Sequence, residues 1–204
     1  MKDKGKFITF EGVDGAGKSS HIDEVICFLE SQKISVKRTR EPGGTKLGEK
    51  LRELLLYDEM DPETETLLMF AARRQHIAEV IKPALDEGLF VVSDRFTDAT
   101  YAYQYGGKHV AYSKIEALEA WVHPDLKADL TLLFDLPVEI SIDRLKKNRT
   151  LDKFEKESEA FFNCLRNVYL DLARQHPNRY RIINANQSIK SVSHDVIKAI
   201  KSIL

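Results

Sequence analysis

One segment near the start of the chain has the residue types and spacing of a phosphate-binding loop. Residues 12–19 fit the pattern G-x-x-x-x-G-K-[ST]. Glycines let backbone N–H groups approach phosphate oxygens closely, because they lack a Cβ and tolerate positive φ. We expect Lys18 to reach the β and γ phosphates and the Ser19 hydroxyl to ligate Mg²⁺. The segment predicts a nucleoside triphosphate site formed by Gly12, Val13, Asp14, Gly15, Ala16, Gly17, Lys18, Ser19 and Ser20.

A carboxylate and a guanidinium follow an apolar run later in the chain. Asp94 and Arg95 come directly after residues 89–93, and ligands bind at the carboxyl ends of parallel strands. We expect Asp94 to hold the Mg²⁺ shell, directly or through water, and Arg95 to clamp a second phosphate. The competing interpretation is a structural ion pair at a strand end. Asp135 also ends an apolar run and is a rival metal-side acid, ranked lower because no basic residue follows it before Arg144.

Two sets of helix-spaced side chains could bind a flat heterocycle. Phe70 and Arg74 are four residues apart, and Thr100, Tyr103 and Gln104 lie at i, i+3 and i+4, so each set shares one helix face. An aromatic ring beside hydrogen-bonding groups suits a base, which needs stacking on its faces and polar partners on its edges. The residue types alone favour a plainer interpretation, with Phe70 in the core and Arg74 in solvent.

These residues are positioned by a chain that alternates strands and helices. A helical pattern covers residues 19–32, and a second begins at the cap Asp61 with Pro62 in the first turn and runs to about residue 82, where Pro83 ends or kinks it. Near-continuous apolar strands indicate burial on both faces, which predicts a doubly wound α/β fold with a parallel sheet flanked by helices. The glycine loop then lies between a strand and a helix, where an anion binds, which disfavours an ordinary turn. The five expected strands are residues 6–11, 34–39, 89–93, 130–134 and 180–183.

The composition restricts the classes of partner and compartment. The 204 residues include 31 Lys plus Arg and 32 Asp plus Glu, so no overall positive field attracts nucleic acid or an anionic membrane. No apolar run reaches the roughly 18 residues that cross a bilayer, and residues 1–6 lack the apolar stretch of a signal peptide. We therefore expect a cytoplasmic protein with no nucleic-acid or membrane partner.

The chain contains no linker, repeat or low-complexity tract that would divide it. We expect one domain over residues 1–204. Cys27 and Cys164 are far apart and lack the paired spacing of zinc or redox sites, so we expect both to be buried thiols.

Four blocks of the chain follow one another in the order and at the spacing of a known family: residues 10–19, Thr-Arg-Glu-Pro-Gly-Gly-Thr at 39–45, Asp-Arg-Phe at 94–96 and Ala-Tyr-Gln at 102–104. On these blocks, the whole chain resembles a bacterial thymidylate kinase. The resemblance implies the fold of the P-loop nucleoside monophosphate kinases, with a basic lid. It also implies that the γ-phosphoryl group of ATP is transferred to dTMP, giving dTDP for dTTP synthesis, with Mg²⁺, in a cytosolic homodimer.

The resemblance also gives roles to single residues. In the family, the residue that matches Phe70 stacks on thymine, and those that match Arg74, Thr100 and Gln104 bond or border the base edge. The family's acceptor region corresponds to about residues 40–82 and 95–107. The remaining matches are Tyr103 near C2′ of the sugar, Asp14 at the 3′-hydroxyl, Arg95 at the acceptor phosphate, Arg40, Glu41 and Arg52 along the acceptor cleft, and Arg144 near adenine.

A basic stretch occupies the position of the family's mobile lid, at about residues 144–155. Where relatives often read Arg-x-Arg-Gly-Glu-Leu-Asp-Arg, this chain has Lys-Lys-Asn-Arg-Thr-Leu-Asp-Lys at 146–153, so Asn148 replaces an arginine. The transition-state cation is then Arg149 or Lys153, and we prefer Arg149 because a lysine is not equivalent to an arginine as a phosphoryl clamp. Without the resemblance, the stretch is also compatible with a solvated basic loop.

Two alternative functions remain open from the sequence. One is another small-molecule kinase of the same architecture, because its phosphate loop would look the same. The other is a nucleotide-dependent switch without a phosphate acceptor. The chain has no guanine-reading Asn-Lys-x-Asp motif, which disfavours a GTPase.

Overall fold

A five-stranded parallel sheet forms the centre of the computed structural model, which describes residues 5–146 and 152–204. The strand order is β2-β3-β1-β4-β5, and all four ladders are parallel. The predicted α/β fold is confirmed, and the ends of each strand differ from the prediction by two residues at most. The strands are β1 (Phe7–Glu11), β2 (Val36–Arg40), β3 (Phe90–Asp94), β4 (Leu130–Asp135) and β5 (Tyr180–Asn184).

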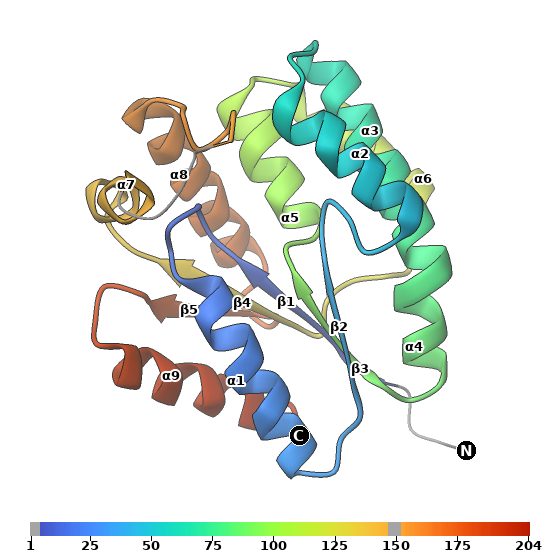
Figure 1. Ribbon diagram of the computed structural model, residues 1–204, viewed down its shortest axis with the longest axis vertical. Helices are drawn as coiled ribbons and strands as arrows, with labels where there is room; N and C mark the ends of the chain where they lie inside the picture. The colour runs from blue at the N-terminus through green and yellow to red at the C-terminus, as the bar shows by residue number, and fades with distance from the viewer. Residues whose placement is uncertain (1–4, 147–151) are drawn as a thin grey trace.

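Helices cover both faces of the sheet (Figure 1). On one face, α1 (Lys18–Ser31) lies beside α9 (Ile189–Lys201), and His21 of α1 stacks against Phe134 of β4. Successive side chains of a strand point to opposite faces. Phe10 therefore packs on Phe134, whereas its neighbour Glu11 meets α8 (Glu159–Gln175) on the other face. The alternation of β1 thus places a carboxylate beneath the phosphate loop.

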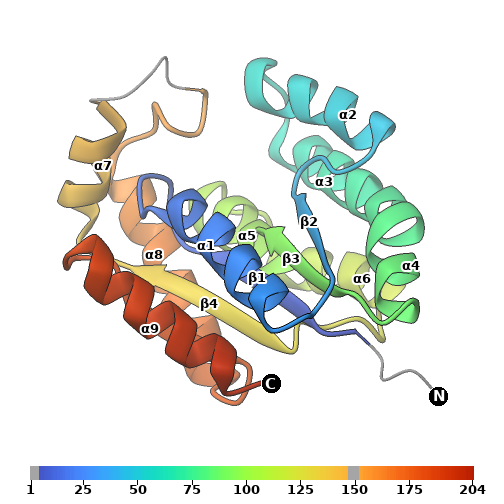
Figure 2. The ribbon, with the colours of Figure 1, turned by 60° about the horizontal axis from the view of Figure 1, so that its bottom comes forward.

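Two helices, α2 (Lys46–Tyr57) and α3 (Pro62–His76), lie above the sheet on the side of β2 and β3 (Figure 2). Across the phosphate loop from α2 lies α7 (Val138–Lys146). Of the shorter helices after β3, α5 is Thr97–Thr100, and α6 (Tyr112–Val122) packs against α3. Asp61 caps α3, because its Oδ1 accepts hydrogen bonds from the Glu63 and Thr64 amides at 2.9 and 3.2 Å. The predicted cap is confirmed.

Two segments depart from regular α-helix. A π-helix over Ile77–Ile81 follows α3 and leads into α4 (Lys82–Asp86), so the chain passes Pro83 through a wider turn. This fits the missing amide donor of proline, which removes one i→i−4 hydrogen bond. A second π-helix, Tyr101–Gly107, continues α5 and carries Tyr103 and Gln104.

The prediction of two buried thiols is wrong, because Cys27 and Cys164 are both exposed. In α1 the buried face is formed by Ile22, Val25 and Leu29, and Cys27, two residues after Val25, points to the opposite side. Within the described residues, no helix is both long and apolar enough to span a bilayer.

Candidate functional site

The phosphate loop connects the end of β1 to the start of α1, as the sequence predicts. Gly12, Gly15 and Gly17 have φ values of 129°, 79° and 91°, the region that favours glycine. A Cβ on Gly12 would lie 2.5 Å from the Phe134 carbonyl oxygen. Gly17 caps α1 without a side-chain hydrogen bond to the first turn. The first amides of α1 therefore remain available to an anion.

Lys18 lies inside this loop rather than in solvent. Its Nζ donates to the carbonyl oxygens of Gly12 and Val13, at 2.8 and 3.0 Å. Burial, together with repulsion from Arg95, lowers the pKa of Lys18 to about 8, although Asp14 opposes the shift. A cation held by backbone carbonyls at this position is ready to exchange them for phosphate oxygens.

The Arg95 side chain contacts the phosphate loop, α8 and the π-helix 101–107 at one point. Its Nη1 donates to the Gly12 carbonyl oxygen and the Tyr169 hydroxyl, both at 3.0 Å. Its Nη2 donates to Asp14 Oδ1 at 2.5 Å and to the Tyr103 hydroxyl at 2.9 Å. Arg95 adopts φ 70°, which is uncommon outside glycine, and such backbone outliers cluster at functional sites. Arg95 is thus paired with Asp14 of the phosphate loop and not with the adjacent Asp94.

The charges around Arg95 have strongly shifted pKa values. Burial alone would raise the pKa of Asp14, but Arg95 and Lys18 have the opposite effect and bring the pKa down to about 2. Burial lowers the pKa of Arg95, but Asp14, Tyr103, Tyr169 and Asp94 together more than offset this, so the net direction is upward. Perturbed groups that converge in a cleft are typical of active sites.

Glu11 and Tyr169 also belong to this cluster, and neither is predicted from the sequence. Glu11 is fully buried; its Oε1 accepts from the Phe96 amide at 2.7 Å and its Oε2 from the Tyr169 hydroxyl at 3.0 Å. Burial, reinforced by Asp98, raises the pKa of Glu11 to about 8. A carboxylate in an otherwise apolar strand was the one available signal. Nothing in the sequence pointed to Tyr169.

Asp94 has the geometry expected of a metal-side acid. Its Oδ1 is buried and makes no hydrogen bond within residues 5–146 and 152–204. Asp94 and Ser19 line the same cavity, and carboxylate and hydroxyl oxygens are the ligands that Mg²⁺ accepts. The rival, Asp135, is already engaged by Arg166, whose Nε and Nη2 donate to its two carboxylate oxygens at 2.6 and 2.9 Å.

Two cavities meet at this cluster. We name the larger, about 1210 Å³, the loop cavity, and the smaller, about 550 Å³, the base cavity. They share four lining residues, Asp14, Glu41, Arg52 and Arg95. The loop cavity is also lined by Gly15, Gly17, Lys18, Ser19, Ser20, Arg40, Asp94, Arg144 and Leu145. The base cavity is also lined by Pro42, Leu56, Met69, Arg73, Phe96, Ala99, Thr100, Tyr103, Gln104, Asp152 and Phe154.

The residues of α3 that line the base cavity are each one position before the predicted ones. Phe70 and Arg74 are absent from the described residues that line the cavities, whereas Met69 and Arg73 are present. Phe70 is 1 % exposed and belongs to the core, and Arg74 is exposed. Adjacent residues of an α-helix point about 100° apart. The predicted pair shares a face, but that face is not the one toward the cavity.

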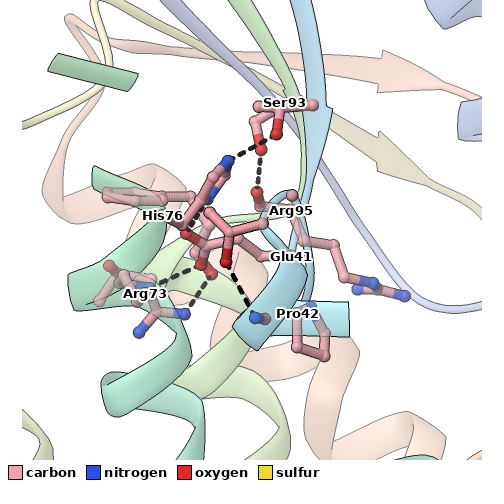
Figure 3. Close-up of polar contacts among 12 residues, drawn as sticks. Glu41, Pro42, Arg73, His76, Ser93 and Arg95 are labelled. Atoms are coloured by element: carbon pink, nitrogen blue, oxygen red, sulfur yellow. Dashed lines mark hydrogen bonds and ion pairs between the residues drawn. The ribbon is translucent and has the colours of Figure 1, made fainter. Parts of the chain in front are cut away.

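Arg73 is fixed by a buried network (Figure 3). Its Nε donates to Glu41 Oε2 at 2.7 Å, while His76 Nδ1 lies 2.8 Å from the other oxygen of Glu41. Its Nη2 donates to Thr100 Oγ1 at 3.0 Å. Figure 3 shows Arg73 and His76 pointing at the Glu41 carboxylate, while the Arg95 side chain extends away from it. Burial opposes ionisation of Glu41, yet Arg73 and His76 together bring its pKa below the usual value. The buried Arg73 Nη1 has no hydrogen-bond partner among the described side chains and backbone groups.

The remaining predicted residues lie around the rims. Arg40 pairs with Glu49 at 2.7 Å, and Arg52 Nη1 donates to the Pro42 carbonyl oxygen at 2.9 Å. Arg144 Nη2 donates to the Ala185 carbonyl oxygen at 3.1 Å. Arg149 lies outside the described residues. Lys153 Nζ is paired with Glu65 at 2.8 Å, and its neighbours Asp152 and Phe154 line the base cavity.

Comparisons with known proteins agree on one family. A family model described as Thymidylate kinase matches residues 10–196. The chain is 62 % identical over 194 residues to a thymidylate kinase of Methylobacillus flagellatus, covering 95 % of this chain and 96 % of the relative. It is 56 % identical over 202 residues to one from Cupriavidus pinatubonensis, covering 98 % and 100 %. The crystal structure of thymidylate kinase from Ehrlichia chaffeensis superposes with a TM-score of 0.79 at 33 % identity, covering 97 % of this chain and 99 % of that one.

Proposed function

The chain belongs to the thymidylate kinase family, and from this premise we propose how its two cavities divide the reaction. The enzyme transfers the γ-phosphoryl group of ATP to dTMP, giving ADP and dTDP. We assign ATP to the loop cavity and dTMP to the base cavity. The observation that carries this assignment is the shared wall, Asp14, Glu41, Arg52 and Arg95, because two phosphates that react must meet where the cavities join.

At the donor side, backbone amides and Lys18 hold the ATP phosphates. The bound phosphates replace the Gly12 and Val13 carbonyl oxygens as partners of Lys18, and their negative charge stabilises the ammonium group that burial disfavours. Ser20 closes the loop, and Arg144, at the end of α7, lies on the side that we assign to adenine. Positive charge at these positions offsets the repulsion between two polyanions.

We propose that Ser19 and Asp94 hold Mg²⁺, directly or through water. The buried Asp94 Oδ1, without a hydrogen bond in the described part of the chain, fits a cation. Held by these two residues, the cation would supply positive charge that offsets the negative charge of the phosphates during transfer. Asp94 is the last residue of β3 and is paired with Phe10 of β1, so the sheet fixes its position relative to the loop after β1.

At the acceptor side, Arg95 orients the dTMP phosphate toward the donor. Asp14 accepts from the 3′-hydroxyl, and Tyr103, bonded to Asp14 Oδ2 at 2.5 Å, lies against the sugar. Arg73 presents its unpartnered Nη1 to the base edge, taking the position that the sequence analysis gave to Arg74. Met69 and Phe154 contact the faces of the ring, and Thr100 and Gln104 border its edge. Arg40, Glu41 and Arg52 form the outer wall of the cleft.

We propose that Arg149 is the lid cation that follows the moving phosphoryl group, within a lid at about residues 144–155. Lys153, the other sequence-based candidate, is held by Glu65, which favours Arg149. Comparing Arg149→Ala with Lys153→Ala in single-turnover assays tests this. A roughly 10²-fold loss is expected for Arg149→Ala, and a larger loss in Lys153→Ala would assign the role to Lys153.

We further propose a homodimer in the cytoplasm, formed by one domain per chain. Neighbouring helices α2, α3 and α6 each expose a large apolar side chain: Leu54 at 44 %, Leu67 at 56 % and Trp121 at 81 %. Apolar side chains gathered on adjacent helices support an interface between copies. Sedimentation velocity should give a dimer, and Leu67→Glu should shift it to the monomer; a monomeric wild type would refute this.

The experiment that tests the activity is a coupled assay of ADP formation with ATP, Mg²⁺ and a panel of monophosphates: dTMP, dUMP, UMP, CMP, AMP and GMP. We expect dTMP to give the highest kcat/KM and dTDP to appear in proportion to ADP. Preference for another monophosphate would indicate a different kinase. ATP consumption independent of any acceptor would favour a nucleotide switch.

A further inference from the structure

Glu65 is a buried carboxylate that the roles assigned above leave unexplained. It lies in α3, is 0 % exposed, and is not among the described residues that line either cavity. Its Oε1 accepts from Gln104 Nε2 at 3.0 Å, and its Oε2 faces Lys153 Nζ at 2.8 Å and Lys108 Nζ at 3.3 Å. Burying a carboxylate is costly unless it is paired. A carboxylate at this position therefore suggests that it serves to position the three side chains that it contacts, Gln104, Lys108 and Lys153.

The contact with Glu65 determines which way the Gln104 amide points. A carboxylate accepts hydrogen bonds, so the amide must turn its NH₂ group toward Glu65 and its carbonyl oxygen away. The two lysines occupy Oε2, which leaves Oε1 for the amide. Gln104 lines the base cavity, and its Oε1 accepts no hydrogen bond within the described ranges. Gln104 thus offers the cavity a hydrogen-bond acceptor, and Arg73, which also lines the cavity, keeps a buried N–H group, Nη1, without a partner in the described part of the chain.

We propose that Glu65 is a positioning residue that makes the base cavity select pyrimidines with a protonated ring nitrogen. This inference rests on the proposed placement of dTMP. Thymine and uracil present N3–H as a donor beside O4 as an acceptor, which complements Gln104 Oε1 and Arg73 Nη1. Cytosine presents an acceptor at N3 beside an amino donor at C4, so both hydrogen bonds are reversed. Glu65 prevents the amide flip that would accommodate cytosine.

The same carboxylate also holds one wall of the cavity. The ammonium groups of Lys108 and Lys153 lie 5.0 and 5.2 Å from the ring centre of Phe154, and Phe154 meets Tyr103 edge to face at 5.6 Å. Both lysines are therefore fixed from two sides, by the carboxylate and by the ring. This arrangement resists rotation of Glu65, which keeps Oε1 directed at Gln104.

The test is Glu65→Gln, with kcat and KM measured for dTMP and dCMP. An amide at position 65 can donate to Gln104 Oε1, so Gln104 can turn its NH₂ into the cavity. We expect kcat/KM for dTMP to fall about 10- to 100-fold, mostly through KM, because a buried hydrogen bond is lost or reversed. We expect the ratio of kcat/KM for dTMP over dCMP to fall at least about tenfold. If the substitution only loosened the structure, kcat/KM would fall by the same factor for dTMP and dCMP, and the ratio would stay unchanged.

The matched control is Glu63→Gln, the same chemical change two residues away on α3. Glu63 is 54 % exposed and pairs with Lys114 in solvent, so its kinetics should match the wild type. If Glu65→Gln does not fold, the double variant Glu65→Gln/Lys153→Gln keeps the charge balance of the cluster, and the same ratio is measured. A dTMP-to-dCMP ratio within twofold of the wild type in the folded variant overturns the inference. A wild type that forms no dTDP would instead refute the proposed function.

Discussion

Met69 and Phe70 provide the sharpest test of the base cavity, because they are adjacent on α3 and point in different directions. Phe70 is 1 % exposed in the core. Phe70→Ala should destabilise the protein by about 3–5 kcal/mol, which lowers Tm by about 6–20 °C in a chain of this length. Met69 lines the base cavity and is half-buried. Met69→Ala removes three side-chain atoms from contact with the base, about 1–1.5 kcal/mol, so Kd for dTMP should rise about tenfold.

The assay combines thermal unfolding with calorimetric titration of dTMP. Phe70→Leu serves as the binding variant, because it keeps an apolar side chain in the core while removing the aromatic ring. We expect its Kd for dTMP to stay within about twofold of the wild type, since Phe70 has no contact with the cavity. If Phe70→Leu weakens dTMP binding tenfold and Met69→Ala leaves it unchanged, the base stacks on Phe70 and our assignment of the cavity face is wrong.

Four further predictions concern the charged groups. Arg95→Ala should lower kcat by about 10²-fold or more, whereas Arg38→Ala, which removes an exposed ion pair, should leave steady-state kinetics unchanged. Burial lowers the pKa of Lys18 to about 8, so kcat/KM for ATP should fall as pH rises above about 8; a flat profile to pH 9.5 would contradict this. Burial raises the pKa of Glu11 from 4.5 to about 8; the folded state then keeps a proton that the unfolded chain has released, so the free energy of unfolding should fall as pH rises between these values. Urea denaturation at pH 5, 6, 7 and 8 measures this slope, and Glu11→Gln should reduce it. Asp94→Asn should raise the Mg²⁺ concentration for half-maximal activity by tenfold or more, and an unchanged Mg²⁺ titration would exclude Asp94 from the metal site.

Much of the fold follows from local pattern. Apolar runs bounded by glycine or charge identify most strands of the described sheet, whereas β2 is largely polar, and Asp61 with Pro62 marks the start of α3. The strand order does not follow from such patterns, because pairing is decided by contacts between distant segments. The π-helices at 77–81 and 101–107 are equally hidden, since their periodicity differs from that of an α-helix only over a short segment.

The candidate site was predictable where a backbone motif fixes it and not where distant partners do. The glycine loop and Asp94 lie where strand ends place them. Helical spacing shows which residues share a face, but it does not show which face meets a cavity, so it did not indicate Met69. Ion pairs such as Arg166 with Asp135 or Lys153 with Glu65 join residues from separate elements, and a single sequence carries no signal for them.

The ladder between β1 and β3 sets how far apart the two nucleotides lie. Phe10 is paired with Asp94, and the Arg95 amide donates to the Phe10 carbonyl oxygen at 3.0 Å. The distance between the phosphate loop and Arg95 is therefore set by the register of β1 and β3 and does not depend on a hinge. Inserting a single residue into β3 would turn the side chains beyond it to the opposite face of the sheet, and Asp94 and Arg95 would lose their alignment with the phosphate loop.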